Sequence, residues 1–316
     1  MPARTPLPPP DFRPHAALPE LAVVRQATAV GNWSSIRTIH ESCTDEQVRH
    51  AASWAVVETE GAPQLIALAL KHNPGDHLAG TLLAHWHLRA AWTARGAAQA
   101  SEIAPAQWAE FRHHLDHAER LLTHVIAHEP DTVLAWTLRH STALGLSLGL
   151  SEARRRHHHL IRLHPHHYIG QRIMLRQLLP KWGGSWEAAE AFARQSMREA
   201  PDGSMSAALV AEYHLERWSA RKNPRDHRHL RQPQVRAELA QAAARSVLHP
   251  HCRARYGVTQ AHSTFAMLAS IAGDHHAAAE HFRAMSPFAS TEPWEHLGRF
   301  PQTYFMDNRK RALAKG

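Results

Sequence analysis

Three stretches of the chain end in the same way: HHLDHAERLLTHVIAHEP (residues 113–130), SEARRRHHHLIRLHP (151–165) and WEAAEAFARQSMREAP (186–201). Each is a segment with helical apolar periodicity that stops at a proline. Proline has no backbone N–H and cannot continue a helix, so it ends one helix and begins the next unit. The steps between these prolines are 35 and 36 residues, which indicates a repeated helical hairpin.

Prolines follow apolar segments at three further places, Pro74, Pro250 and Pro287. The step from Pro250 to Pro287 is 37 residues, close to the hairpin period of roughly 34 residues. The steps from Pro74 to Pro130 and from Pro201 to Pro250 are 56 and 49 residues. These longer steps require insertions of roughly half a repeat, or a degenerate extra hairpin.

Other positions keep the same register. Twelve residues before three successive prolines lie small residues: Ala118, Ala153 and Ala189. Small residues allow two helices of one hairpin to approach closely. Five residues before the same prolines lie Val125, Leu160 and Ser196. Abundant alanine and leucine with few glycines also favour helix over sheet.

This pattern, from Ala106 to Pro201, resembles the tetratricopeptide (TPR) family, and Trp136 stands where TPR units often carry an aromatic. The segment GDHHAAAEHF (Gly273–Phe282) is similar to the family's turn and second helix, although its run to Pro287 is about three residues short. The resemblance covers about half the chain. It implies an all-α fold: a right-handed α–α superhelix of TPR-like helical hairpins with irregular repeats.

A second resemblance rests on the loop Lys181-Trp182-Gly183-Gly184-Ser185, followed by Phe192-Ala193-Arg194 and later by AEYHL (211–215). This stretch is similar to a bacterial family of TPR-like proteins with a KWGGS-type motif and no settled activity. Within the loop, we expect Ser185 to cap the next helix, with Gly183 or Gly184 at positive φ. Trp182 and Trp186 are expected to pack the hairpin.

The predicted organisation has three parts: a disordered Pro-rich N-terminus (1–19), one repeat domain (20–299) and a basic tail (300–316) that frays. Within the domain, 20–105 is expected to be divergent and 106–299 to hold clearer repeats, with inserted loops at 95–105 and 219–233. The expected helices span 44–60, 62–72, 76–95, 105–128, 131–148, 151–163, 166–179, 185–199, 204–219, 234–248, 254–271 and 274–285.

Charge, cysteine content and apolar runs indicate the cellular compartment of the protein. The formal charge is +8, but the 36 basic and 28 acidic residues are not gathered into one block. Cys43 and Cys252 are far apart, which indicates free thiols in a reducing compartment. No apolar run is long enough for a signal peptide or a membrane span. We therefore expect a cytoplasmic protein that does not bind a membrane.

Histidine is the most unusual feature, with 29 residues in 316. Weak metal candidates, for zinc or another divalent transition metal, are the sets His164, His166, His167 and His249, His251, Cys252. His157, His158 and His159 are consecutive and splay around a helix, so they do not converge. In 105–128 the histidines lie opposite the apolar stripe. The favoured interpretation is a surface rich in solvated histidine, with no cofactor.

No HExxH, GxSxG, P-loop or GxGxxG motif occurs, so we do not expect an enzyme. The expected function is a protein-interaction scaffold that holds a peptide in a concave groove. Groove candidates are Arg172, Arg176, Glu212 and Glu216. A slightly favoured alternative is that these arginines pair with these glutamates. Two other hypotheses are polyanion or nucleic-acid binding through Arg154–Arg156, the histidines and the tail, and a histidine-based metal protein.

Overall fold

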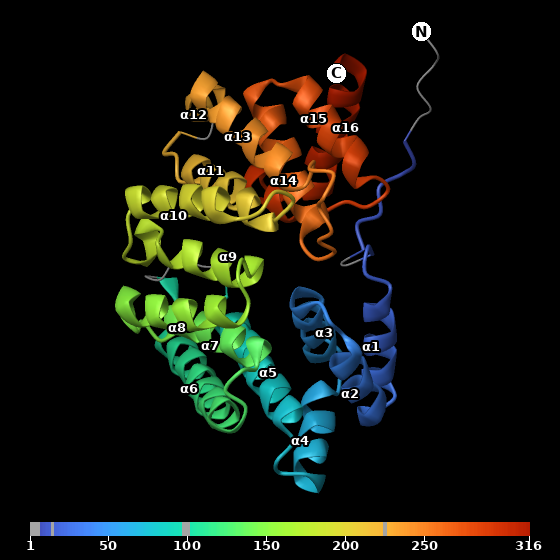
Figure 1. Ribbon diagram of the computed structural model, residues 1–316, viewed down its shortest axis with the longest axis vertical. Coiled ribbons are helices and arrows are strands. Elements are labelled where there is room, and N and C mark those ends of the chain that lie inside the picture. The colour runs from blue at the N-terminus through green and yellow to red at the C-terminus, as the bar shows by residue number, and fades with distance from the viewer. Residues whose placement is uncertain (1–6, 14–15, 97–101, 224–225) are drawn as a thin grey trace. The chain divides into compact units, whose positions relative to one another are not determined.

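The computed structural model describes residues 7–13, 16–96, 102–223 and 226–316, and over these ranges the regular elements are all helices (Figure 1). The predicted all-α class is confirmed. The chain divides into two compact units. The first unit is Leu18–Gly184, and the second is Ser185–Gly316 together with the segment up to Ala17.

The helices of the first unit are α1 (Glu20–Ala29), α2 (Trp33–Ser42), α3 (Glu46–Val57), α4 (Ala62–His72), α5 (His77–Arg95), α6 (Pro105–His128), α7 (Val133–Gly145), α8 (Gly149–Leu163), α9 (Tyr168–Gln177) and the short 3-10 helix η2 (Pro180–Trp182). Those of the second are α10 (Trp186–Glu199), η3 (Met205–Ala208), α11 (Leu209–Ser219), α12 (Arg228–Arg231), α13 (Pro233–Arg245), α14 (Val258–Ala272), α15 (His275–Met285), η4 (Glu292–Leu297) and α16 (Pro301–Lys315).

Every proline singled out in the sequence follows the end of a helix. The helices that end before these prolines are α4, α6, α8, α10, α13 and α15. The expected range of each helix agrees with the structure to within a few residues, and α4 and α6 agree at both ends. Helices α1, α2, α12 and α16 were not expected. Part of the predicted loop at 95–105 and residues 224–225 of the other loop lie outside the described residues.

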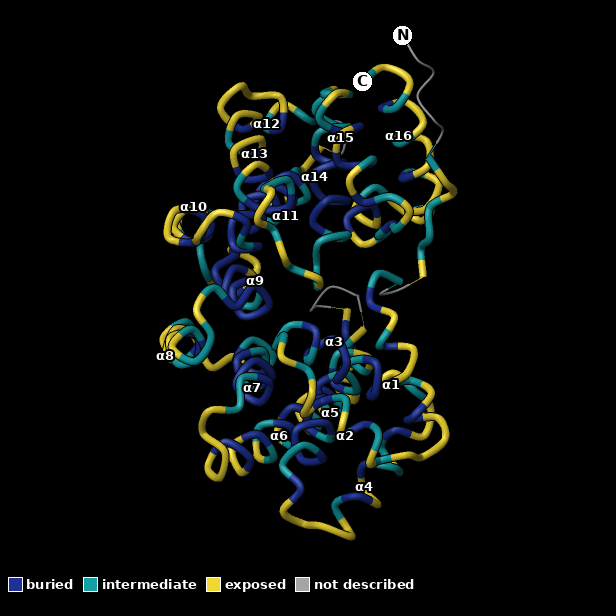
Figure 2. Tube along the Cα trace, turned by 45° about the vertical axis from the view of Figure 1, so that its right-hand side comes forward, coloured by how far each residue is buried: buried dark blue, intermediate teal, exposed yellow. Residues whose placement is uncertain are grey.

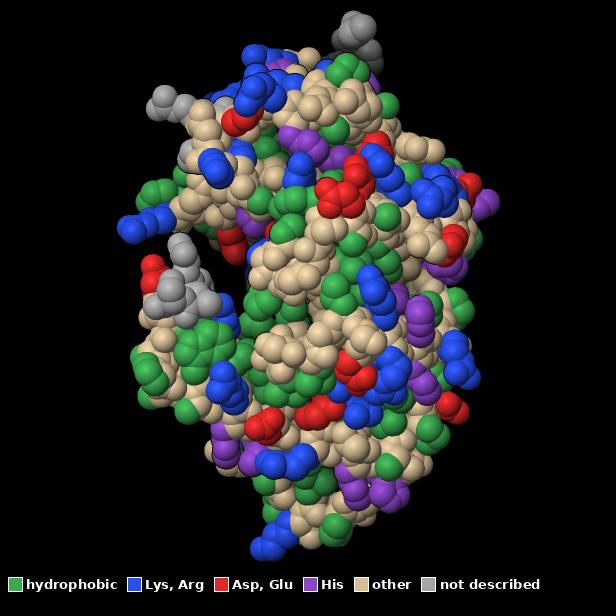
Figure 3. Space-filling view, turned by 90° about the vertical axis from the view of Figure 1, so that its left-hand side faces the viewer, with side chains coloured by type: hydrophobic (Ala, Val, Ile, Leu, Met, Phe, Trp, Pro, Cys, Tyr) green, Lys and Arg blue, Asp and Glu red, His purple; other side chains and the backbone are tan. Residues whose placement is uncertain are grey.

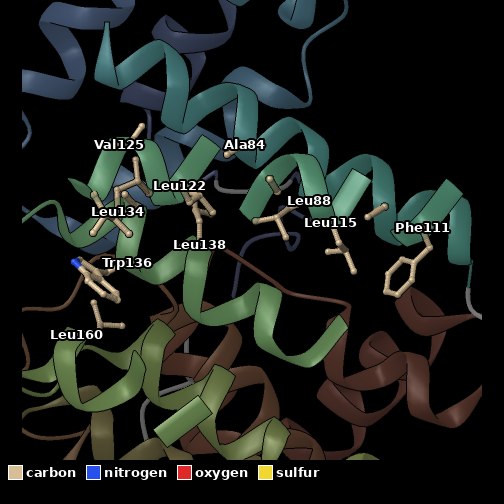
Figure 4. Packing of buried hydrophobic residues seen from close by; sticks show 14 residues of the cluster. Ala84, Leu88, Phe111, Leu115, Leu122, Val125, Leu134, Trp136, Leu138 and Leu160 are labelled. Atoms are coloured by element: carbon tan, nitrogen blue, oxygen red, sulfur yellow. The ribbon is translucent and has the colours of Figure 1, made fainter. Parts of the chain in front are cut away.

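The core of the first unit joins α5, α6, α7 and α8 (Figure 4). Phe111, Leu115 and Leu122 line the buried side of α6, and Trp136 and Leu160 reach the same cluster from α7 and α8. The small residues expected at close contacts, Ala118, Ala153 and Ala189, are all fully buried. Ala84 and Leu88 of α5 belong to this core, and α5 packs against α6. The expected division of the domain at residue 105, between a divergent part and clearer repeats, therefore runs between two helices that pack together.

The packing order in the first unit is that of stacked hairpins. Helix α5 packs on α6, α6 on α7, α7 on α8 and α8 on α9. The first helices of successive hairpins also touch: α3 packs on α5, α5 on α7 and α7 on α9. In Figure 2, α9 is dark blue along most of its length because Tyr168, Ile169, Gln171 and Met174 are buried. This order is the one expected for stacked helical hairpins, while the TPR resemblance and the superhelical repeat stay predictions.

The Lys181–Ser185 loop has the local geometry expected from its glycines. Gly183 lies at φ +88°, a conformation that favours glycine, and it ends η2. A Cβ on Gly184 would lie 2.0 Å from the carbonyl oxygen of Leu178, so only glycine fits there. The Ser185 Oγ accepts a hydrogen bond from the Ala188 N–H at 3.1 Å and caps α10. The boundary between the two units falls inside this loop.

Residues 7–13 and 300–316 are more ordered than the sequence suggested. Residues 300–316 were expected to fray, but α16 places Phe305 and Ala312 in fully buried positions. Within the Pro-rich start, residues 7–13 contact the rest of the second unit, to which they belong: Asp11 pairs with Phe288 in an isolated β-bridge, and the Arg309 side chain donates to the Pro8 carbonyl. Residues 1–6 and 14–15 lie outside the described residues.

None of the described helices combines the length and the apolar character that crossing a bilayer requires.

Candidate functional site

Histidine occurs both on the surface and in the interior of this protein. Histidine side chains are visible between charged groups on the face drawn in Figure 3. On α6, the predicted solvated histidines His113, His124 and His128 are exposed, whereas the fourth, His117, is half-buried. The interpretation of histidine as a solvated surface residue is nevertheless wrong for a second group, whose members are at most 7% exposed: His40, His50, His85, His140, His157, His167, His214, His262 and His281.

Desolvation favours the neutral form of several buried histidines. Burial lowers the pKa of His40 and His157 to about 4 and that of His167 to about 3. The pKa values of His85 and His140 are lowered well below the usual range for the same reason, and neighbouring histidines add to the effect. Helical periodicity did not reveal this group, because histidine occurs on either face of an amphipathic helix.

The structure brings predicted metal candidates together in pairs, with ring centroids 5.1 Å apart for His164 and His167 and also for His249 and His251. His167 caps α9, and its Nδ1 accepts the Gly170 N–H at 3.1 Å, so that lone pair is already used. His249 Nδ1 accepts the backbone N–H of His251 at 3.2 Å. His164, His166 and Cys252 are half-buried side chains near these positions. Over the described ranges, no group of three or more His, Cys, Asp or Glu side chains could hold a metal ion.

The groove candidates lie on two helices of different units. Arg172 and Arg176 are on α9 of the first unit. Arg172 is half-buried, with its guanidinium 5.8 Å from the ring centroid of Tyr168, and Arg176 is exposed. Glu212 and Glu216 are on α11 of the second unit and are half-buried.

The arginine run on α8 does not present three free cations. Arg156 is 2% exposed and forms ion pairs with Glu119 at 2.8 Å and Glu152 at 2.7 Å. Arg155 is bonded to Glu152 as well, and only Arg154 is exposed without an ion pair among the described residues. Arg156 links α8 to α6 and Arg155 is paired within α8, so neither guanidinium is free to bind a polyanion.

A pocket of about 380 Å³ opens in the first unit between α2, α3, the start of α5 and the turn from α6 to α7. At its wall, Asp76 is 4% exposed and caps α5 by accepting the Ala79 N–H at 3.1 Å. The same carboxylate accepts the Trp33 indole N–H at 2.9 Å and an ion pair from Arg37. These contacts tie α2 to α5 and shape the pocket.

Carboxylates dominate the lining of this pocket, which we call the acidic pocket. Five carboxylates and two guanidinium groups line it: Glu41, Glu46, Asp76, Glu129, Asp131, and Arg37 and Arg49. His77 Nδ1 lies 2.6 Å from the Glu129 carboxylate at the rim. Sequence reasoning did not find this site, because its acidic residues are scattered between positions 41 and 131 with no motif spacing.

A second pocket, of about 580 Å³, lies in the second unit beside α11, α12 and α13. Three side chains in its wall form a chain of hydrogen bonds. Glu238 lies 3.1 Å from His214 Nε2, and His214 Nδ1 lies 3.0 Å from His229 Nε2. The bonds from His214 and Arg194 lower the pKa of Glu238 to about 2, so it stays ionised. Because an ionised carboxylate only accepts, His214 donates through Nε2 to Glu238.

Comparison with known proteins supplies no relative for either pocket. No family model matches the sequence, and no curated protein matches it.

Proposed function

We propose that this protein is a non-enzymatic interaction scaffold of TPR-like helical hairpins, which holds a segment of another protein. The observation that supports the proposal is the order of helix contacts in the first unit, where α3, α5, α7 and α9 pack in succession. In stacked hairpins, the row of first helices forms an extended surface suited to a peptide. Arg176, exposed on α9, is a position of this row.

The experiment is site-specific photo-crosslinking in cells, with a photoreactive residue placed at Arg176 on α9. The matched control position is Arg162, which is exposed on α8, the second helix of a hairpin. We expect crosslinks to a defined protein from position 176 and few from position 162. Equal yields from both positions, or none from either, would contradict the scaffold.

A charge reversal tests the role of the arginine itself. Arg176→Glu should weaken capture of the crosslinked partner, whereas Arg162→Glu should leave it unchanged. Both side chains are exposed, so neither change should alter the thermal unfolding temperature. Unchanged capture by Arg176→Glu would remove this arginine from the binding surface.

A further inference from the structure

The acidic pocket is opposite in charge to the protein that carries it. The chain has a formal charge of +8, yet the lining of this pocket has an excess of carboxylates over guanidinium groups. Clefts lined by one sign of charge raise the local concentration of ligands of the opposite sign. The pocket volume, about 380 Å³, is in the range of sites that hold a side chain or a small molecule.

Both arginines of the pocket are already engaged. Arg37 is paired with Asp76, which is almost fully buried. Arg49 is paired with Glu46 and donates to the carbonyl oxygens of His40 and Cys43. These cations are therefore used to join α2, α3 and α5, and they are not free to receive an anion.

The carboxylates at the rim are in the opposite situation. Glu41 and Asp131 are exposed and line the pocket, and their side chains form no hydrogen bond or ion pair with the described residues. Their negative charges are therefore not neutralised by a partner within the described protein and can interact with a bound cation. A guanidinium or ammonium group offers donors alone, which is the complement of this lining.

His40 supplies an independent indication of a missing partner. It lines the pocket at 3% exposure, and neither of its ring nitrogens has a hydrogen-bond partner in the described part of the chain. Burial, with the nearby Arg49, lowers its pKa to about 4, so the ring is neutral and retains an acceptor nitrogen. A buried polar group without a partner is unfavourable, so the wall of the pocket contains an unmet hydrogen-bonding capacity.

We propose that the acidic pocket binds the positively charged side chain of a lysine or arginine in the protein segment that the scaffold holds. The inference rests on the proposed function for its source of ligand. The preference for a cation follows from the carboxylates and the neutral imidazole in the pocket lining, and it does not depend on the proposed function.

The test is an NMR titration of the full chain with an N-acetylated pentapeptide that carries a single central arginine. The matched ligand has citrulline in that place, which keeps the shape and removes the charge. We expect the arginine peptide to shift the amide signals of Gly75 and Thr132, and the citrulline peptide to leave them unchanged. The shifts should weaken as salt is raised, because the rim carboxylates are exposed.

The variant Glu41→Gln/Asp131→Asn should weaken binding of the arginine peptide about fivefold, since each exposed ion pair contributes modestly. Its control is Glu60→Gln/Asp116→Asn, which removes the same charge from exposed positions of the same unit outside the pocket lining. Equal binding of the two peptides, no binding of the arginine peptide, or an unchanged affinity in the pocket variant would overturn the proposal.

Spermidine, added as a competitor, separates the source of the cation. If spermidine shifts the pocket signals and the arginine peptide does not, the pocket takes a free polyamine and the proposal fails. The proposed scaffold function is tested separately. If no crosslinks formed from position 176, that function would be rejected even if the pocket bound the peptide. Crosslinks without pocket binding would remove only the pocket assignment.

Discussion

Neighbouring residues of one type have different environments at the scale of the single side chain. Within the run Arg154–Arg156, Arg156 is buried and bonded to Glu119 and Glu152, while 59% of the Arg155 side chain is exposed. Burial acts to raise the pKa of Glu119, but hydrogen bonds from Arg156 and Thr142 outweigh it, and the net shift is downward. The carboxylate is therefore ionised and depends on its cations.

We expect Arg156→Met to lower the free energy of unfolding by about 3 kcal/mol, because it leaves the carboxylate of Glu119 with one arginine fewer in a half-buried site. The control Arg155→Met should change it by less than about 0.5 kcal/mol, since that ion pair is exposed. Urea denaturation measures both. Equal effects would show that the ion pairs around Arg156 do not stabilise the fold.

At the scale of the element, α16 makes the C-terminal segment part of the core of the second unit. Phe305 is fully buried, with ring centroids 5.1 Å from Phe12, 5.1 Å from Phe282 and 5.6 Å from Trp294. Phe305→Ala should lower the free energy of unfolding by about 3–4 kcal/mol, because it leaves a cavity among aromatic rings. Thermal unfolding followed by circular dichroism measures the change.

The neighbouring residue is the control for this element. Met306 is 42% exposed, and Met306→Ala should have little effect. A fraying tail, as its basic composition suggested, would instead give two equally mild variants.

At the scale of the whole molecule, the buried histidines make stability depend on pH. Five of them have folded-state pKa values below the unfolded value of about 6.5, so the unfolded chain binds more protons between pH 6.5 and about 4; they are His40, His157, His167, His262 and His281. Stability is therefore full above pH 6.5 and is lost as pH falls through that window. Each histidine contributes about 1.4 kcal/mol per pH unit. With several acting together, we expect acid unfolding between about pH 5 and 6.

His40→Leu is the variant that checks this cause. It replaces a buried ring without hydrogen-bond partners in the described structure by an apolar side chain, so it should raise stability at pH 7 by about 1 kcal/mol. It should also make the decline below pH 6.5 shallower by about 1.4 kcal/mol per pH unit. Fluorescence-detected unfolding at a series of pH values measures both effects, and an unchanged slope would argue against neutral His40.

The sequence by itself determined the helices around Pro130, Pro165 and Pro201, because local signals act within one helix: apolar periodicity, a proline after each end, and small residues at close contacts. It also predicted the Ser185 cap and a positive φ at Gly183, which depend only on adjacent residues. It missed α1, α2, α12 and α16. The amphipathic periodicity is weak in α1 and α16, and α12 is only one turn long, but in α2 the periodicity is strong.

Only the tertiary structure decided which polar residues are buried and which meet. Glu41, Asp76 and Asp131 form one pocket because three separate helix ends converge, and no spacing along the chain encodes that convergence. His40 and Arg156 resemble surface residues in sequence, yet contacts from other helices enclose them. Burial depends on what packs over a helix face, and that covering comes from residues distant in the chain.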